Sequence, residues 1–138
     1  MATPEKVGYG RMKALTVRQP WAWLLFHGKP MENRNWASEY RGQLAIHAAQ
    51  GMTQDEYDDA LAFVGAFDPD LAASVPDAID LVRGAVIGTV RMTECVQTHS
   101  SPFFHGKFAF VFDNQQVFDS PVPARGALGL WDWEPGVK

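Results

Sequence analysis

The chain has 138 residues, 46% of them hydrophobic and 20% charged, and a formal net charge of −4 at pH 7. Its length and composition are typical of one globular domain, and the acidic net charge argues against strong nonspecific binding of duplex nucleic acid. It has no apolar run near the roughly 18 residues that a membrane span needs and no signal-peptide pattern, so we expect a cytoplasmic protein without a membrane partner. With one cysteine, Cys95, and no histidine pair at a zinc-ligand spacing, we expect no metal site and no cofactor.

The charges are distributed unevenly along the chain. Between Arg11 and His47 there are six basic residues and two acidic ones, whereas residues 51–80 contain eight carboxylates and no lysine or arginine. An anionic ligand would therefore be attracted to the first of these regions. The alternative is a charge asymmetry that serves no partner.

The first part of the chain predicts an arm, a strand and a short helix. Residues 1–10 lack periodicity and are expected to form a flexible N-terminal arm, which leaves residues 11–138 as a single domain. The segment Lys13–Val17 favours a first strand. Pro20–His27 predicts a short, largely buried helix, because proline is tolerated in a first helical turn and Gly28 can end the helix.

Two further extended segments precede the acidic region. We expect Met31–Trp36 to be extended or irregular. The alternation in Gln43–Ala48 predicts a strand with Leu44 and Ile46 on one face and His47 on the other.

The acidic region predicts two helices from their start signals. Thr53 and Glu56 have capping-box spacing, which predicts a helix to about Val64 with its acidic residues in solvent. Asp68 followed by Pro69 predicts a second, short helix.

The rest of the chain predicts strands. Gly84–Val96 is long and β-branched, Phe108–Phe112 alternates, and Asp113-Asn114 is expected to turn the chain into a short return strand, Gln116–Phe118. Ala127–Trp133 is expected to be the last strand. Short strands around an acidic helical insertion indicate an α+β fold, a small mixed β-barrel with flanking short helices.

Five segments, in order along the chain, carry a resemblance to the ASCH family. They are Arg18–Ala22 (RQPWA), Gly28–Trp36 (GKPMENRNW, with the pattern Gly-Lys-x-x-Glu-x-Arg-x-Trp), Tyr40–Ala48 (YRGQLAIHA), Gly84–Gly88 (GAVIG) and Pro121–Trp131 (PVPARGALGLW). The resemblance implies a PUA-like fold and RNA binding in a cleft flanked by the segment that contains Lys29 and Arg34. It also implies two enzymatic activities found among members, amidohydrolysis of an acylated cytidine (N4-acetyl) and ribonuclease cleavage.

Lys29 and Glu32 are the first candidate site residues. A carboxylate three positions away would orient the ammonium and favour its charged form, which suits phosphate binding, whereas a catalytic lysine needs a desolvated environment. The alternative for this pair is a purely structural ion pair.

Four arginines are candidate ligand-binding residues. Arg18 and Arg34 flank the Lys29 segment, and a guanidinium matches a phosphate or a base edge bidentately, although one of the two could instead hold Glu32 or a backbone carbonyl. Arg41 and Arg125 each precede a glycine, which permits close approach of backbone or ligand. Arg41 could equally stabilise the turn before its strand.

Two tryptophans and one histidine complete the candidate set. Trp21 and Trp36 lie near the basic residues in sequence and offer stacking surfaces for unpaired bases, although core packing is the alternative for each. His47 is a candidate general acid or base, with a structural role as the alternative.

These residues support several hypotheses about function. The first is binding of single-stranded RNA or a modified nucleoside or nucleotide. The second is a metal-independent ribonuclease in which Lys29 or an arginine stabilises the pentavalent phosphate and His47 moves protons. The candidate catalytic residues are Lys29, Glu32 and His47. The third is an amidohydrolase, which Glu32 disfavours because such members have a threonine at this position; Glu94 is a candidate for their distant acid. The fourth is a protein-interaction adaptor, and the oligomeric state is left open.

Overall fold

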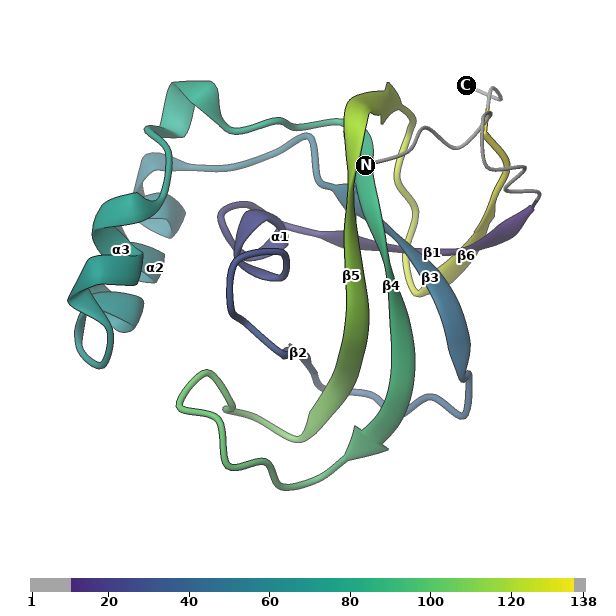
Figure 1. The fold of residues 1–138 in the computed structure, drawn as a ribbon, viewed down its shortest axis with the longest axis horizontal. Helices are drawn as coiled ribbons and strands as arrows, with labels where there is room; N and C mark the ends of the chain where they lie inside the picture. The colour runs from purple at the N-terminus through teal and green to yellow at the C-terminus, as the bar shows by residue number, and fades with distance from the viewer. Residues whose placement is uncertain (1–10, 136–138) are drawn as a thin grey trace.

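The computed structural model describes residues 11–135, so the arm expected at residues 1–10 lies outside the described residues. The chain forms a mixed α+β fold with one six-stranded sheet and a few short helices (Figure 1). The elements are β1 (Met12–Val17), α1 (Trp21–Leu24), β2 (Met31–Arg34), β3 (Gly42–Ala48), α2 (Gln54–Gly65), α3 (Pro69–Ser74), the 3₁₀ turn η1 (Ala78–Asp80), β4 (Ala85–Val96), β5 (Phe108–Pro123) and β6 (Leu130–Trp133).

The strands form one sheet in the order β2-β5-β4-β3-β1-β6. β1 and β3 are parallel, and the other neighbouring pairs are antiparallel. The sheet is strongly twisted, since β4 and β5 run across the direction of β1 and β6 (Figure 1). The predicted barrel is wrong in one respect: closure would require the edge strands β2 and β6 to pair with each other, and the sheet remains open between them.

The prediction of a turn at Asp113-Asn114 followed by a return strand is also wrong. β5 continues from Phe108 to Pro123 and pairs with β4 along its length. Asn114 adopts a positive φ of 53°, and the register between the strands shifts beside it, between Thr89 and Arg91. The turn-forming residue therefore makes a β-bulge, in which one extra residue is absorbed without reversing the chain.

The predicted helices are present, with one shorter than expected. The Thr53 side chain accepts from the Glu56 backbone N–H, and the Glu56 side chain accepts from that of Thr53, so the capping box starts α2. The Asp68 side chain caps α3 by accepting from the Leu71 backbone N–H. The segment Pro20–His27 is regular α-helix only over the four residues of α1, and turns complete it. None of the helices in residues 11–135 has the length and apolar character needed to cross a membrane.

The packing places α1 between the sheet and the other helices. Leu24 of α1 packs with Tyr57 and Val64 of α2 in one buried cluster, and α2 and α3 lie together on that side of the sheet (Figure 1). Four strand termini lie at the same end of the sheet: the ends of β1, β3 and β5 and the start of β4. The strand pairing shows this, because Ala48 pairs with Val17, Ala85 pairs with Ala48, and Pro123 pairs with Ala85. This strand end holds the largest cavity described below.

Candidate functional site

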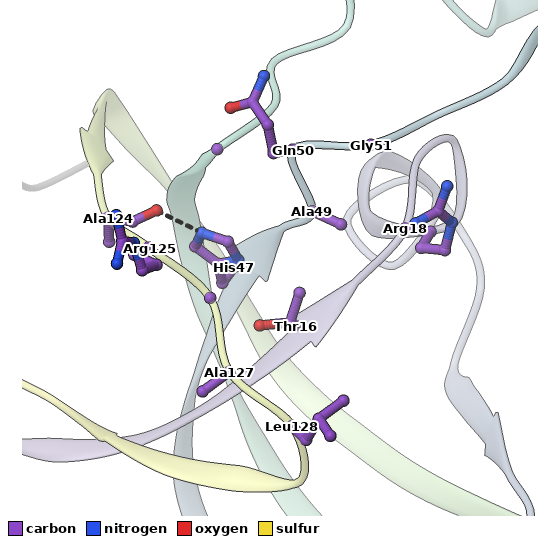
Figure 2. Close-up of a pocket in the computed structure, with 12 residues that line it drawn as sticks. Thr16, Arg18, His47, Ala49, Gln50, Gly51, Ala124, Arg125, Ala127 and Leu128 are labelled. Atoms are coloured by element: carbon purple, nitrogen blue, oxygen red, sulfur yellow. Dashed lines mark hydrogen bonds between the residues drawn. The ribbon is translucent and has the colours of Figure 1, made fainter.

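A cavity of about 540 Å³, here called the large cavity, lies where β1 and β3 end and the segment after β5 returns over them (Figure 2). Its walls come from β1, β3, the segments after both strands, and residues 124–128. The lining residues are Thr16, Arg18, His47, Ala49, Gln50, Gly51, Gly84, Ala124, Arg125, Gly126, Ala127 and Leu128.

The charged residues that line the large cavity are both arginines. Figure 2 shows Arg125 and Arg18 on opposite sides of it, with His47 and Thr16 between them. Arg125 is exposed and makes no hydrogen bond or ion pair with another residue of 11–135. Because two guanidinium groups and no carboxylate line the wall, the cavity favours an anion.

Arg18 is already paired with a carboxylate of α2. Its Nη2 donates to Glu56 Oε1 at 2.6 Å, and its Nε donates to the other carboxylate oxygen. These hydrogen bonds lower the pKa of Glu56 to about 2, so the pair stays ionised at neutral pH. Both side chains are substantially exposed, and an incoming anion can therefore compete with Glu56 for Arg18.

His47 is buried at the base of the large cavity with one ring nitrogen unpaired. Its Nε2 lies 2.7 Å from the carbonyl oxygen of Ala124, and since a carbonyl only accepts, Nε2 carries the proton. Nδ1 is left as a buried acceptor without a partner among the described residues. Burial lowers the pKa of His47 and outweighs the hydrogen bond to Ala124, so the imidazole is neutral at pH 7.

Strand register and a glycine position the groups around His47. Thr16 is the partner of His47 in the parallel β1–β3 pair, and its Oγ1 accepts from Trp131 Nε1 at 3.1 Å. The Trp131 ring meets the imidazole edge-on at 5.6 Å between centroids. Gly126 packs directly on this group, because a Cβ there would lie 2.7 Å from Thr16 Oγ1 and 2.8 Å from His47 Cε1. The close approach predicted for an Arg-Gly pair is thus found at Gly126.

A second charged group, the buried charge cluster, consists of Lys29, Glu32 and Arg34. Lys29 Nζ donates to Glu32 Oε1 at 2.7 Å, and Arg34 Nη2 donates to Glu32 Oε2 at 2.9 Å. The side chains of Lys29 and Glu32 are only 3% and 9% exposed. Burial alone would raise the pKa of Glu32, but the two cations and their hydrogen bonds outweigh it, and the pKa lies below its ordinary value.

The buried charge cluster faces a smaller cavity of its own. Lys29 Nζ lies 4.8 Å from the centroid of the Trp21 ring, a cation–π distance. A cavity of about 120 Å³ adjoins it, lined by Trp21, Lys29, Glu32, Asn33 and His105. This space is too small for a nucleotide, and the Glu32 carboxylate contributes to its wall.

One hydrogen bond connects the cluster to the large cavity. Arg34 Nη2 also donates to the backbone carbonyl of Thr16 at 2.9 Å, so the guanidinium spans from Glu32 to β1. The Thr16 side chain lines the large cavity. Arg34 therefore supports the cavity from behind and does not line it.

The remaining predicted residues lie away from both cavities. Trp36 packs edge-on against Phe110 at 5.0 Å and belongs to the core periphery. Arg41 is exposed and donates to the backbone carbonyls of Ser38 and Tyr40, which holds the turn before β3. These placements match the structural alternatives considered for both residues.

The structure thus divides the predicted site. Arg18, Arg125 and His47 come together at the large cavity, whereas Lys29, Glu32 and Trp21 adjoin the small one. Sequence reasoning did not single out several residues of the large cavity: Thr16, Ala49, Gln50, Gly51, Gly84, Ala124, Ala127 and Leu128. What could have pointed to these residues is their place in the sequence, because they follow the predicted strands or pair with strand residues at one end of the sheet.

No family model matches this chain, and no curated protein is significantly similar to it in sequence.

Proposed function

We propose that the chain binds a nucleotide-like anion, such as single-stranded RNA or a modified nucleotide, in the large cavity. The observation that carries this proposal is the pair of arginines, Arg18 and Arg125, on opposite sides of a cavity of about 540 Å³ whose lining residues include no carboxylate. A guanidinium can bind a phosphate bidentately, so each of the two arginines can hold a phosphate of a strand that crosses the cavity.

The family resemblance implies RNA binding, but in a cleft flanked by the segment that contains Lys29 and Arg34, and this is the one ASCH-like segment of the five that does not line the large cavity. Four of the five ASCH-like segments contribute residues to this cavity, among them Arg18, His47, Gly84 and Arg125. We propose on these grounds that the chain is an ASCH-like, PUA-like domain. The buried charge cluster then has a supporting role, since Arg34 fixes the backbone of Thr16 behind the ligand.

Salt-dependent RNA binding tests the proposal. A ten-nucleotide single-stranded RNA is titrated into the protein at several salt concentrations, with affinity followed by fluorescence anisotropy. We expect the affinity to fall with salt, and Arg125→Ala to weaken binding and to reduce the logarithmic salt slope by about one phosphate contact.

The matched control is Arg91→Ala. Arg91 is an exposed arginine on β4 that is engaged by Asp113 and does not line the large cavity. A flat salt response, or equal weakening by Arg91→Ala and Arg125→Ala, contradicts the proposal.

Ribonuclease cleavage is a second candidate function, favoured by one observation. His47 Nδ1 is an unpaired acceptor beside the two arginines, and Nε2 is held by Ala124, so the ring is fixed in the tautomer that could take a proton at Nδ1. Cleavage of single-stranded RNA in the presence of a chelator, lost in His47→Gln and retained in Arg91→Ala, supports this activity. Intact RNA after prolonged incubation with bound protein contradicts it.

A further inference from the structure

A third cavity of about 280 Å³, here called the apolar cavity, lies between α1, the segment before β4, and the second half of β5. Its lining residues are Gln19, Trp23, Phe26, His27, Pro76, Asp80, Leu81, Val82, Ile87, Val117, Phe118 and Pro121. Two of the exposed large hydrophobic residues, Val82 and Val117, are in its wall, and Ile79, which is 91% exposed, adjoins Asp80. Apolar side chains left in solvent around a cavity indicate a binding surface.

The apolar cavity and the large cavity are neighbours at the same end of the sheet. Val82 lines the first and Gly84 the second, and the Cα atoms of residues two positions apart are separated by at most about 7 Å. Ala124 N–H donates to Gly84 C=O at 3.1 Å, and both residues line the large cavity. A ligand with a charged end and a flat apolar end, joined by a linker the length of a sugar, can therefore reach both.

The polar groups that the apolar cavity offers to a ligand are acceptors. The Gln19 side chain is occupied, because it donates to Val82 C=O at 2.8 Å and accepts from Trp23 N–H at 2.9 Å. His27 Nδ1 lies 2.8 Å from Trp23 C=O, so Nδ1 carries a proton, and Nε2 is an acceptor when the ring holds only that proton. Asp80 forms no ion pair within residues 11–135, and its carboxylate accepts only.

We infer that the apolar cavity holds the base of the nucleotide whose phosphate lies in the large cavity, and that Asp80 favours a base with an amino group over uracil. The inference rests on the proposed function and names the ligand class of that site more narrowly. Trp23 and His27 are stacked at 3.6 Å with an angle of 4° between their planes, which makes a flat aromatic wall for a base. Amino groups of cytosine, adenine or guanine can donate to Asp80, whereas the N3–H donor of uracil lies between two carbonyl oxygens that the Asp80 carboxylate would repel.

Calorimetric titration with three small ligands tests the inference. The ligands are ribose 5-phosphate, uridine 5′-monophosphate and cytidine 5′-monophosphate, which share the charged end and differ only in the base. We expect ribose 5-phosphate to bind most weakly and the cytidine nucleotide to bind at least about fivefold more tightly than the uridine nucleotide, as one good base contact provides.

Two variants assign that preference to the apolar cavity. Asp80→Asn is expected to abolish the preference for cytidine, because an amide can also donate to a uracil oxygen. Val117→Asp is expected to reduce both nucleotides to the affinity of ribose 5-phosphate. The matched control is Asp77→Asn, an exposed acid three residues away that does not line the apolar cavity.

The outcomes separate this inference from the proposed function. Equal affinities for all three ligands, with an effect of Arg125→Ala but none of Asp80→Asn, overturn the inference and leave anion binding in the large cavity standing. Equal affinities for the two nucleotides, both above ribose 5-phosphate, overturn the amino-group preference. If none of the ligands and no RNA binds, the proposed function and the inference both fall.

Discussion

Gly126 lies against the His47 ring so closely that a Cβ in its place would be 2.8 Å from Cε1 and 2.9 Å from Nδ1. The same Cβ would meet Thr16 Oγ1 at 2.7 Å. The segment between β5 and β6 can therefore cover the ends of β1 and β3 only with a glycine at this position. This contact defines the base of the large cavity and leads to the first prediction.

Gly126→Ala should destabilise the fold and widen the large cavity. Each of the three contacts is below 3.0 Å, and the neighbours are a buried ring and a hydroxyl held by Trp131, so the segment must move. We expect a loss of about 1–3 kcal/mol in the free energy of unfolding, measured by chemical denaturation, together with weaker RNA binding.

Gly65→Ala is the matched control for that substitution. A Cβ at Gly65 would meet the Ala72 Cβ at an ordinary 3.7 Å, and Gly65 is the last residue of α2. Alanine there should leave stability unchanged or raise it slightly. If both variants behave alike, the close packing of Gly126 on His47 has no energetic consequence.

Stability should fall as the pH drops from about 7 to 5 because of His47. Burial lowers the pKa of His47 in the folded state below its ordinary value, whereas the unfolded chain titrates near about 6.5. Between the two values the unfolded state binds more protons than the folded state, so the free energy of unfolding rises with pH and is lost on acidification. Denaturation curves of the wild type and His47→Gln at pH 8, 7, 6 and 5 measure this.

The His47→Gln variant should show a flatter dependence over that range. Glutamine can still donate to the Ala124 carbonyl, so the comparison isolates the titration. Carboxylates with a lowered pKa, such as Glu32 and Glu56, contribute at more acidic pH and do not confuse the comparison. Identical pH profiles for the two proteins would exclude His47 as the source.

Glu32→Gln should be among the most damaging single substitutions. It leaves Lys29 and Arg34 close together in the interior with no counter-charge, and loss of one partner from a buried ion pair costs about 3–5 kcal/mol. Asp113→Asn removes a pair of similar length with Arg91 on the surface and should have a much smaller effect. Comparable unfolding midpoints for the two variants would show that the cluster is better solvated than its burial indicates.

The parts of the fold that depend on neighbours in sequence were predictable. The capping box at Thr53 and Glu56 and the Asp68 cap place two helix starts at the right residues. β1, β3 and β4 follow from alternation within two residues of their observed ends. Local hydrogen bonds and side-chain period set these features, and both are visible in a short window of sequence.

Short-range sequence patterns could not predict that the sheet stays open or that the candidate site residues separate into two cavities. Asp113-Asn114 has the composition of a turn, and only pairing with β4 converts it into a bulge of β5. Lys29 and His47 are both near arginines in the sequence, but β2 pairs with β5 whereas β3 pairs with β1 and β4. Lys29, directly before β2, and His47, on β3, therefore lie at different places along the sheet, which no local pattern reports.

Glu56→Gln should strengthen anion binding while leaving α2 intact. Glutamine can replace glutamate in a capping box, but it cannot neutralise Arg18, which would then present a free guanidinium to the large cavity. We expect a several-fold gain in affinity for the ten-nucleotide RNA, which corresponds to the free energy of about one charge-assisted hydrogen bond.

Glu39→Gln makes the same change in net charge at an exposed position outside the large cavity, and should have little effect. A gain of equal size in both variants would assign the effect to net charge. A loss of affinity in Glu56→Gln alone would mean that Glu56 orients Arg18 for the ligand and does not compete with it.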